Sequence, residues 1–521
     1  NDPKKQQQRQ SGGLSVDNSS AENHTTIFSI SESPKNGKVI WVGTDDGNVQ
    51  VTRDGGATWT NVAGNVPGVP KGTWVSTVEA GRHDEGTAFV TFDGHMAGDM
   101  KTYVYKTADF GATWTPLATD ALAGYAHVIR QDLESPDLLF LGTETGLFIS
   151  VDGGARWARF TGKLPKVAVR DLAIHSRDAD LIVATHGRGV YILDDITPLR
   201  KLRREDLEAE LVPLPSRQAI MMIPASLQEF AGNDEFVANN PDEAATIAYY
   251  LKKRHIVGDF KVEVFDSAGQ LISTLPAGKR RGINRVLWPM RLPPPKLPPA
   301  NSLVMGSMFT MFGPRVLPGT YTVKLTQGEK TYTTQVELVP DPRATHTDED
   351  RRLQHETAMT LYGMLGRLTY VAETVASLEE AASGRAEDLP KGDRLRRQLE
   401  SLAGQLGGFR STLVATSEGG WLSGDEQLRE HMAKLYGSVN GYDGRPSRSQ
   451  LDQTKFLGAE LEKAEARLEA LQRGEVAAVN RELEKRKLAP LKVKPREDWE
   501  KEEGKRTAAL PAVFALPFLL F

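Results

Sequence analysis

Short apolar segments recur before residue 200, and each ends in a small residue followed by threonine. They occupy residues 39–44, 138–143 and 181–185. A second short apolar segment follows each of them, at 49–52, 147–150 and 190–193. Short apolar runs bounded by turn residues are typical of β-strands. The pattern therefore predicts repeated pairs of antiparallel strands.

A turn motif with the pattern S/T-x-D-x-G-x-x-W occurs three times, each time after a strand-like segment. Its members are Thr52, Asp54, Gly56 and Trp59, then Thr107, Asp109, Gly111 and Trp114, then Ser150, Asp152, Gly154 and Trp157. The hydroxyl and carboxylate can bond the turn backbone, and glycine permits positive φ. The tryptophan can fill the space between adjacent sheets. These residues are predicted to be structural Asp-box positions.

The spacing of the motif indicates the fold. The three tryptophans, at positions 59, 114 and 157, are 55 and 43 residues apart, and periods of about 40–50 residues with several short strands are typical of β-propeller blades. We expect about four blades over residues 25–197, after a polar N-terminal arm at 1–24. Because propellers commonly have about four to eight blades, we expect a larger ring, completed by another part of the protein or by a second chain.

The spacing of apolar residues changes twice along the rest of the chain. A proline-punctuated connector is predicted at 198–238, followed at 239–342 by alternating strands typical of a small β-sandwich. Helical periodicity then predicts a helical hairpin or bundle at 343–490, with a C-terminal tail at 491–521. The expected fold class is mainly β, with a partial propeller, a sandwich and a helical region.

Composition narrows the function classes. The chain has 521 residues, 39% hydrophobic and 25% charged, with a formal net charge of -4 and no cysteine. The small charge gives no reason to expect a nucleic-acid partner, and the absence of cysteine excludes disulfides and thiolate sites. The apolar segment 508–521 contains Pro511 and Pro517 and is too short to span a bilayer. We expect it to pack on protein, with membrane contact as the alternative.

Several segments resemble a known family. Residues 184–195, which read ATHGRGVYILDD, together with 43–47, 103–107 and 170–175, resemble bacterial proteins with sortilin-type propellers built from BNR (Asp-box) repeats. Many of these are labelled glycosyl hydrolases. The resemblance covers 25–197, and 313–321 is more weakly similar to the immunoglobulin-like module that follows such propellers. The cysteine-rich module of animal sortilins is absent, so their sorting roles are not implied.

Candidate site residues fall into two groups. Asp45 or Asp46 and Glu144 occupy the same phase of the repeat, so a structural role explains these acids most simply; Asp93 and Asp194 are further acidic candidates. Four residues that the repeat does not require are candidate ligand contacts: Trp74, His95, His186 and Arg188. No metal site or cofactor is predicted, because metal-ligand spacings and nucleotide-binding loops are absent from the sequence.

Two functions remain open. The first is an exported, periplasmic or secreted binding and assembly protein without catalytic activity, whose partner is a protein, a second chain that completes the propeller, or a glycan. The alternative is a glycoside hydrolase of the Asp-box class, which requires two carboxyl groups on either side of the scissile bond.

Overall fold

The computed structural model describes residues 4, 24–223, 242–299, 310–416 and 426–509. Contacts divide the chain into two compact units. The first comprises Asn1–Arg217, Ala248–Arg254 and Arg280–Asn284, and the second comprises Gln218–Ile247, His255–Lys279 and Arg285–Phe521. The predicted arm at 1–24 and the apolar tail at 508–521 lie almost entirely outside the described residues.

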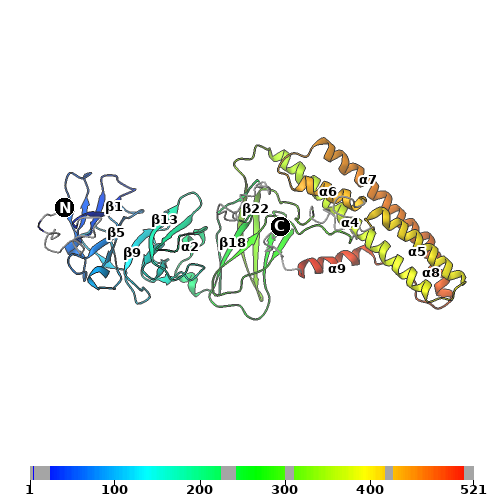
Figure 1. Ribbon diagram of the computed structural model, residues 1–521, viewed down its shortest axis with the longest axis horizontal. Helices are drawn as coiled ribbons and strands as arrows, with labels where there is room; N and C mark the ends of the chain where they lie inside the picture. Colours follow the sequence, from blue (N-terminus) through cyan, green and yellow to red (C-terminus); the bar gives the residue numbers. More distant parts are fainter. Residues whose placement is uncertain (1–3, 5–23, 224–241, 300–309, 417–425, 510–521) are drawn as a thin grey trace. The chain divides into compact units, whose positions relative to one another are not determined.

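Four antiparallel sheets follow one another along the first unit (Figure 1). Blade 1 contains β1 (Ile27–Glu32), β2 (Ile40–Thr44), β3 (Val49–Thr52) and β4 (Thr60–Asn61); blade 2 contains β5 (Trp74–Ala80), β6 (Ala88–Asp93), β7 (Tyr103–Thr107) and β8 (Thr115–Pro116). Blade 3 contains β9 (Ala126–Gln131), β10 (Leu139–Thr143), β11 (Gly146–Ser150) and β12 (Ala158–Arg159); blade 4 contains β13 (Val169–His175), β14 (Asp180–Thr185) and β15 (Val190–Leu193). In each blade the strands pair in chain order. The predicted propeller-type fold is confirmed.

Apolar side chains of neighbouring blades pack together in a separate cluster at each junction. Trp41 and Val49 of blade 1 cluster with Val78 and Trp114 of blade 2. The next two junctions are built in the same way: blade 2 clusters with Ile129 and Trp157 of blade 3, and blade 3 clusters with Leu172 of blade 4. Each blade therefore buries its apolar surface mainly against its neighbours.

Two further sheets follow the blades. One has the order β16 (Leu211–Leu214), β18 (Ala245–Leu251), β21 (Gly282–Trp288); the other has the order β17 (Ala219–Met221), β23 (Lys330–Pro340), β22 (Gly319–Gln327), β19 (Phe260–Phe265), β20 (Leu271–Leu275). β16 and β17 fall within the range predicted as a connector. Pro213 has no backbone N–H to donate to a neighbouring strand. It is tolerated here because β16 is an edge strand.

The C-terminal region is helical, as predicted. After the short helix α2 (Thr197–Lys201) of the first unit, the helices are α4 (Asp348–Glu387), α5 (Arg394–Leu413), α6 (Leu428–Asn440), α7 (Arg448–Leu471), α8 (Ala477–Lys485) and α9 (Arg496–Ala509). Leu361, Leu365 and Leu368 of α4 are fully buried in one core with Leu406 of α5 and Leu461 of α7. Thr347 and Ser447 each begin a helix with a capping box. Of the described helices, none reaches the length and apolar character needed to cross a bilayer.

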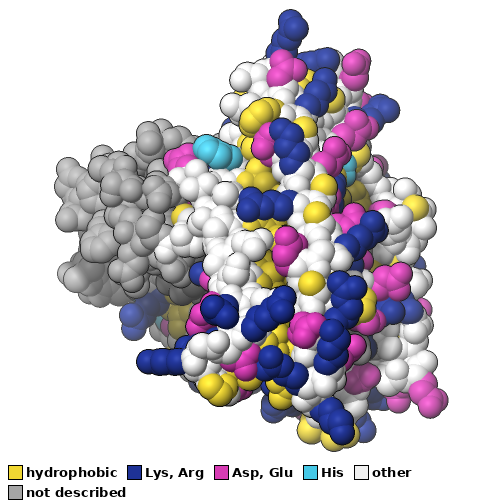
Figure 2. Space-filling view, turned by 90° about the vertical axis from the view of Figure 1, so that its right-hand side faces the viewer, with side chains coloured by type: hydrophobic (Ala, Val, Ile, Leu, Met, Phe, Trp, Pro, Cys, Tyr) yellow, Lys and Arg dark blue, Asp and Glu magenta, His cyan; other side chains and the backbone are white. Residues whose placement is uncertain are grey.

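The described ends of the segment between β21 and β22 are hydrogen-bonded to α6. Tyr436 donates a hydrogen bond to the carbonyl of Phe312 over 2.7 Å, and Asn440 bonds the carbonyls of Phe312 and Gly313. Arg429 bonds the carbonyl of Pro298. The surface seen at the helical end carries interspersed Lys, Arg, Asp and Glu side chains (Figure 2). Among the described residues of that face, positive and negative side chains alternate and do not gather into a patch of like charge.

Candidate functional site

The three predicted Asp-box motifs form the turns between the third and fourth strands of blades 1, 2 and 3. We call these segments, 52–59, 107–114 and 150–157, the acidic turns. In the second, Thr107 donates to the Oδ1 atom of Asp109 over 2.7 Å and accepts from the amide of Gly111 over 2.9 Å. Asp109 also accepts from the Thr113 amide, over 2.9 Å, and from its hydroxyl. Each carboxylate is thus committed to its own turn.

The same bonds recur in the other two acidic turns. Asp54 accepts from Thr52 and from both polar groups of Thr58, while Asp152 accepts from Ser150 and from the Arg156 amide. The hydrogen bonds from Thr58, foremost among the causes, lower the pKa of Asp54 to about 2. A carboxylate that is bonded in this way is a poor proton donor near neutral pH.

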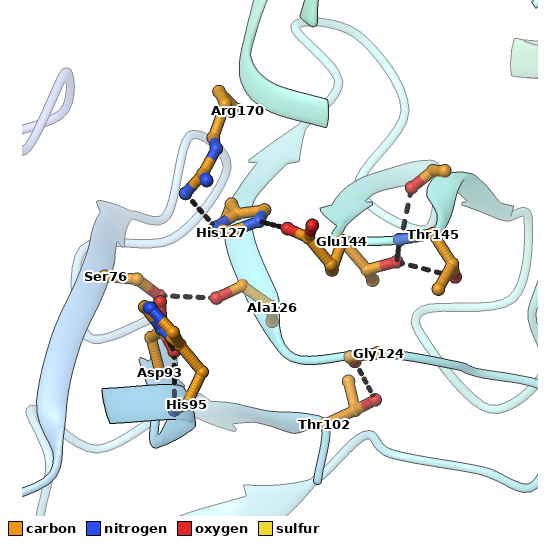
Figure 3. A network of polar contacts seen from close by, with 12 residues as sticks. Ser76, Asp93, His95, Thr102, Gly124, Ala126, His127, Glu144, Thr145 and Arg170 are labelled. Carbon is orange, nitrogen blue, oxygen red and sulfur yellow. Dashed lines mark hydrogen bonds and ion pairs between the residues drawn. The ribbon is translucent and has the colours of Figure 1, made fainter. Parts of the chain in front are cut away.

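A β-bulge interrupts the first strand of every blade at the same repeat position. The register shifts between Ile27 and Ser29 in β1, between Val75 and Thr77 in β5, beside His127 in β9 and between Val169 and Asp171 in β13. The bulged residues are Phe28, Ser76, His127 and Arg170, which we call the bulge row. Bulges redirect side chains and are common near functional sites. The bulge row is therefore our candidate site, and Figure 3 shows three of its members, Ser76, His127 and Arg170.

Residues at the ends of the second strands lie beside the bulge row. Asp45, Glu144 and His186 are equivalent, because their amides bond the carbonyls of Thr26, Tyr125 and Ala168 respectively. Glu144 faces His127 in Figure 3, and its Oε2 atom lies 3.0 Å from Nε2 of His127. Glu144 and His127 thus form a pair that links the end of the second strand of blade 3 to its first strand.

His127 is held between a carboxylate and a guanidinium. Its side chain is 5% exposed, and Nδ1 lies 3.2 Å from the Nη1 atom of Arg170. Because arginine can only donate, Nδ1 accepts, and the proton of the neutral ring is on Nε2, facing Glu144. Burial, aided by the charge of Arg170 and opposed by Glu144, lowers the pKa of His127. Both ring nitrogens are therefore occupied in the neutral form.

Glu144 and Tyr125 complete this side of the site. Burial opposes ionisation of Glu144, but hydrogen bonds from His127 and Tyr125 outweigh it and lower the pKa of Glu144. Burial, together with the bond to Glu144, raises the pKa of Tyr125 to about 12. At neutral pH this side therefore combines a carboxylate, a neutral histidine, a neutral tyrosine and the cation Arg170.

Blade 2 supplies a second pair. Nδ1 of His95 lies 2.6 Å from Asp93, whose Oδ1 atom also accepts the His95 amide over 3.0 Å. The His95 ring stacks on Tyr125 with centroids 4.6 Å apart. This stacking joins the Asp93 pair to the Glu144 cluster across two blades.

A third polar group lies farther along the first strands. Arg130 bridges Glu79 of blade 2 and Asp171 of blade 4, at 3.3 Å and 3.0 Å. Burial, opposed by Arg130 and Arg82, raises the pKa of Glu79. Arg130 also donates to the carbonyl of Leu172 over 2.9 Å. These contacts tie three blades together.

The four predicted ligand contacts separate into two places. Trp74 pairs across the sheet with Asp93 and packs edge-on against Phe28 at 4.7 Å, so Trp74 and His95 both border the bulge row. His186 and Arg188 lie in the exposed turn between β14 and β15, and His186 also borders the bulge row because its amide bonds the Ala168 carbonyl. Sequence reasoning did not select Phe28, Tyr125, His127 or Arg170 as contacts. Phe28, His127 and Arg170 share the bulge position, which the strand register reveals, and Tyr125 lies two residues before His127.

No cluster of three or more histidine or acidic side chains suited to a metal ion is present among the described residues. No protein-family model matches the chain, and no curated protein matches it either.

Solved structures give partial likenesses. YCF48 from Cyanidioschyzon merolae is 18% identical over 33% of this chain and 56% of that one, with a TM-score of 0.24. YCF48 bound to D1 peptide is 16% identical over 32% and 51%, with a TM-score of 0.25. An ancestral GH74 enzyme is 13% identical over 62% and 40%, with a TM-score of 0.28. The chain matches about half of each structure, and likenesses at this level carry no inference about function.

Proposed function

We propose that this protein is a binding and assembly protein without catalytic activity, in which sortilin-type Asp-box blades present the bulge row to a protein or glycan ligand. The state of His127 carries the proposal. A general base needs a nitrogen free to take a proton, and the two nitrogens of His127 already face Glu144 and Arg170. Its lowered pKa further disfavours proton uptake near neutral pH.

The chemistry of the surrounding groups suits recognition. Arg170 is exposed and can pair with an anionic or carbonyl group, while Phe28 and Trp74 provide a partly exposed aromatic surface. Glu144 is ionised at neutral pH and can accept hydrogen bonds from amide or hydroxyl groups. The bulge row thus combines apolar contact with a few fixed polar groups, as binding sites do.

The glycoside hydrolase alternative has one specific candidate. Such an enzyme requires a protonated carboxyl group as its acid, and Glu79 has a raised pKa. However, the Glu79 side chain is 8% exposed and lies between Arg82 and Arg130. A sugar oxygen would have to displace an arginine to reach it. We therefore place Glu79 in the scaffold.

Binding arrays test the proposal. The full chain would be applied to peptide and glycan arrays beside Arg170→Ala and Phe28→Ala, with Arg177→Ala as control because Arg177 is exposed and pairs with Asp178. We expect both bulge-row variants to lose at least tenfold in affinity for the selected ligand while the control binds normally. Turnover of any array ligand that disappears in Glu79→Gln or Glu144→Gln would refute a non-catalytic role.

A further inference from the structure

Blade 1 exposes residues whose counterparts in later blades are buried. Trp59 is 43% exposed, whereas its counterparts Trp114 and Trp157 are each 6% exposed. Ile27 and Ile30 are 61% and 67% exposed. Their counterparts by strand register are Val75 and Val78, Ala126 and Ile129, and Val169 and Leu172. All six are at most 2% exposed.

The two internal junctions show what covers these positions. A Cβ atom on Gly111 of blade 2 would lie 2.7 Å from Val62 of blade 1, and one on Gly154 of blade 3 would lie 2.9 Å from Leu117 of blade 2. Val62 and Leu117 are equivalent, since each follows the fourth strand and its amide bonds the third strand. The acidic turns of blades 2 and 3 thus pack on the residue that follows the fourth strand of the preceding blade.

One polar bond accompanies this packing at the junction of blades 2 and 3, whereas the indole N–H of Trp114 at the other junction is buried without a hydrogen-bond partner among the described residues. The indole N–H of Trp157 donates to the carbonyl of Leu117 over 2.9 Å. Around Gly56, the equivalent glycine of blade 1, a Cβ atom would meet nothing but Trp59 of the same turn within 4 Å. The acidic turn of blade 1 therefore has the same hydrogen bonds as the other two between its hydroxyl, aspartate and glycine, but no described residue of a preceding blade covers it.

We propose that this face of blade 1, formed by Ile27, Ile30, Gly56 and Trp59, docks a complete four-stranded propeller blade from outside this sequence. The docking blade carries a bulky apolar residue directly after its fourth strand, as Val62 and Leu117 do here. That residue covers Gly56, and its carbonyl accepts the Trp59 indole N–H. The inference deepens the proposed assembly role by naming the class of partner.

A second copy of this chain fits less well. Its blade 4 would offer the exposed side chains Val190 and Ile192, but the described part of blade 4 has three strands. It therefore lacks a fourth strand and the residue that follows one. Ile27 and Ile30 would be covered, while Gly56 would gain no side chain like Val62 and Leu117 at the internal junctions, and Trp59 would gain no carbonyl like that of Leu117.

A fusion protein tests the proposal with a blade of known sequence. A copy of residues 66–125, which holds β5–β8 and Leu117, replaces residues 1–26, so that its last residue is joined directly to Ile27. The junction keeps the native register, because Thr26 and Tyr125 accept equivalent hydrogen bonds from Asp45 and Glu144. The copy should then contact blade 1 as blade 2 contacts blade 3. The control carries Leu117→Asp in the added copy alone.

The readout is the solvent exposure of Trp59. Fluorine-labelled tryptophan allows its NMR signal to be assigned with Trp59→Phe and its solvent isotope shift to be measured. We expect the exposure to fall roughly sevenfold, from the 43% of Trp59 towards the 6% of Trp114, and to stay high in the control. A second fusion, with residues 118–168 before Ile27, presents Phe160 in place of Leu117.

Three outcomes overturn the inference. The first is a folded fusion, with native signals for Trp114 and Trp157, in which Trp59 stays exposed. The second is failure of both fusions to fold. The third is concentration-dependent protection of Trp59 in the unfused chain, which would identify a second copy as the partner. Because none of these readouts involves array ligands, they are independent of the test of the bulge row.

Discussion

Replacing Trp157 and Trp59 by alanine should have very different costs, although both occupy the last position of an acidic turn. A buried tryptophan removes about 200 Å² from water, and burial contributes about 25 cal/mol per Å². The exposed fractions differ by 37 percentage points, 43% against 6%, which corresponds to about 2 kcal/mol. The indole bond from Trp157 to the Leu117 carbonyl adds about 1 kcal/mol.

We therefore expect Trp157→Ala to destabilise its blade by about 3–5 kcal/mol, and Trp59→Ala to cost about 3 kcal/mol less. A single unfolding curve would not separate these effects, since a chain of two units is not expected to unfold in one step. Native-state hydrogen exchange, read on peptides covering β11 and β3, measures each blade locally. Equal costs for the two substitutions would refute the reasoning, because the difference depends on the covered face.

Three further effects are expected. The depressed pKa of Asp54, about 2 against an ordinary 3.8, contributes stability that is complete above about pH 4 and is lost between about pH 4 and 2; exchange of blade 1 amides across this range should show a loss that Asp54→Asn lacks. Arg170→Ala should raise the pKa of His127, because it removes a positive charge and part of the burial; an unchanged or lower value in an NMR titration of the ring would contradict the assignment. Tyr436→Phe should destabilise the second unit by about 1 kcal/mol, since it removes the bond to the Phe312 carbonyl; denaturant unfolding followed by a probe in α6 measures it, and no change would argue against that bond.

The turns and the helices could be read from the sequence because their signals are local. Asp109 and Thr113 lie within one turn, so a short motif contains all the partners of the carboxylate. The helical period likewise predicted a helical region, and Leu361 and Leu365, four residues apart in α4, are both buried. Local spacing was sufficient wherever one segment supplied the whole interaction.

The candidate site could not be read in the same way. His127 and Arg170 are 43 residues apart, and they meet because each first strand carries a bulge. A bulge changes the pairing from one-to-one to two-to-one without changing the alternation of apolar residues. Trp74 and His95 were found because they depart from the repeat, whereas His127 sits within an ordinary strand pattern. Aligning the strands by register, rather than by motif, would have grouped the bulge row.

The two end faces of the blade series bear on self-association. Blade 1 exposes Ile27 and Ile30, while blade 4 exposes Val190 and Ile192. Contact between these two different faces on neighbouring copies would be head-to-tail. Such a contact produces open filaments when the rotation between copies does not close a ring. With no fourth strand in the described part of blade 4, Trp59 of a neighbouring copy finds no acceptor there. We therefore expect the three-stranded blade 4 to fit the blade 1 face of a neighbouring copy poorly and so to oppose polymerisation of the free chain.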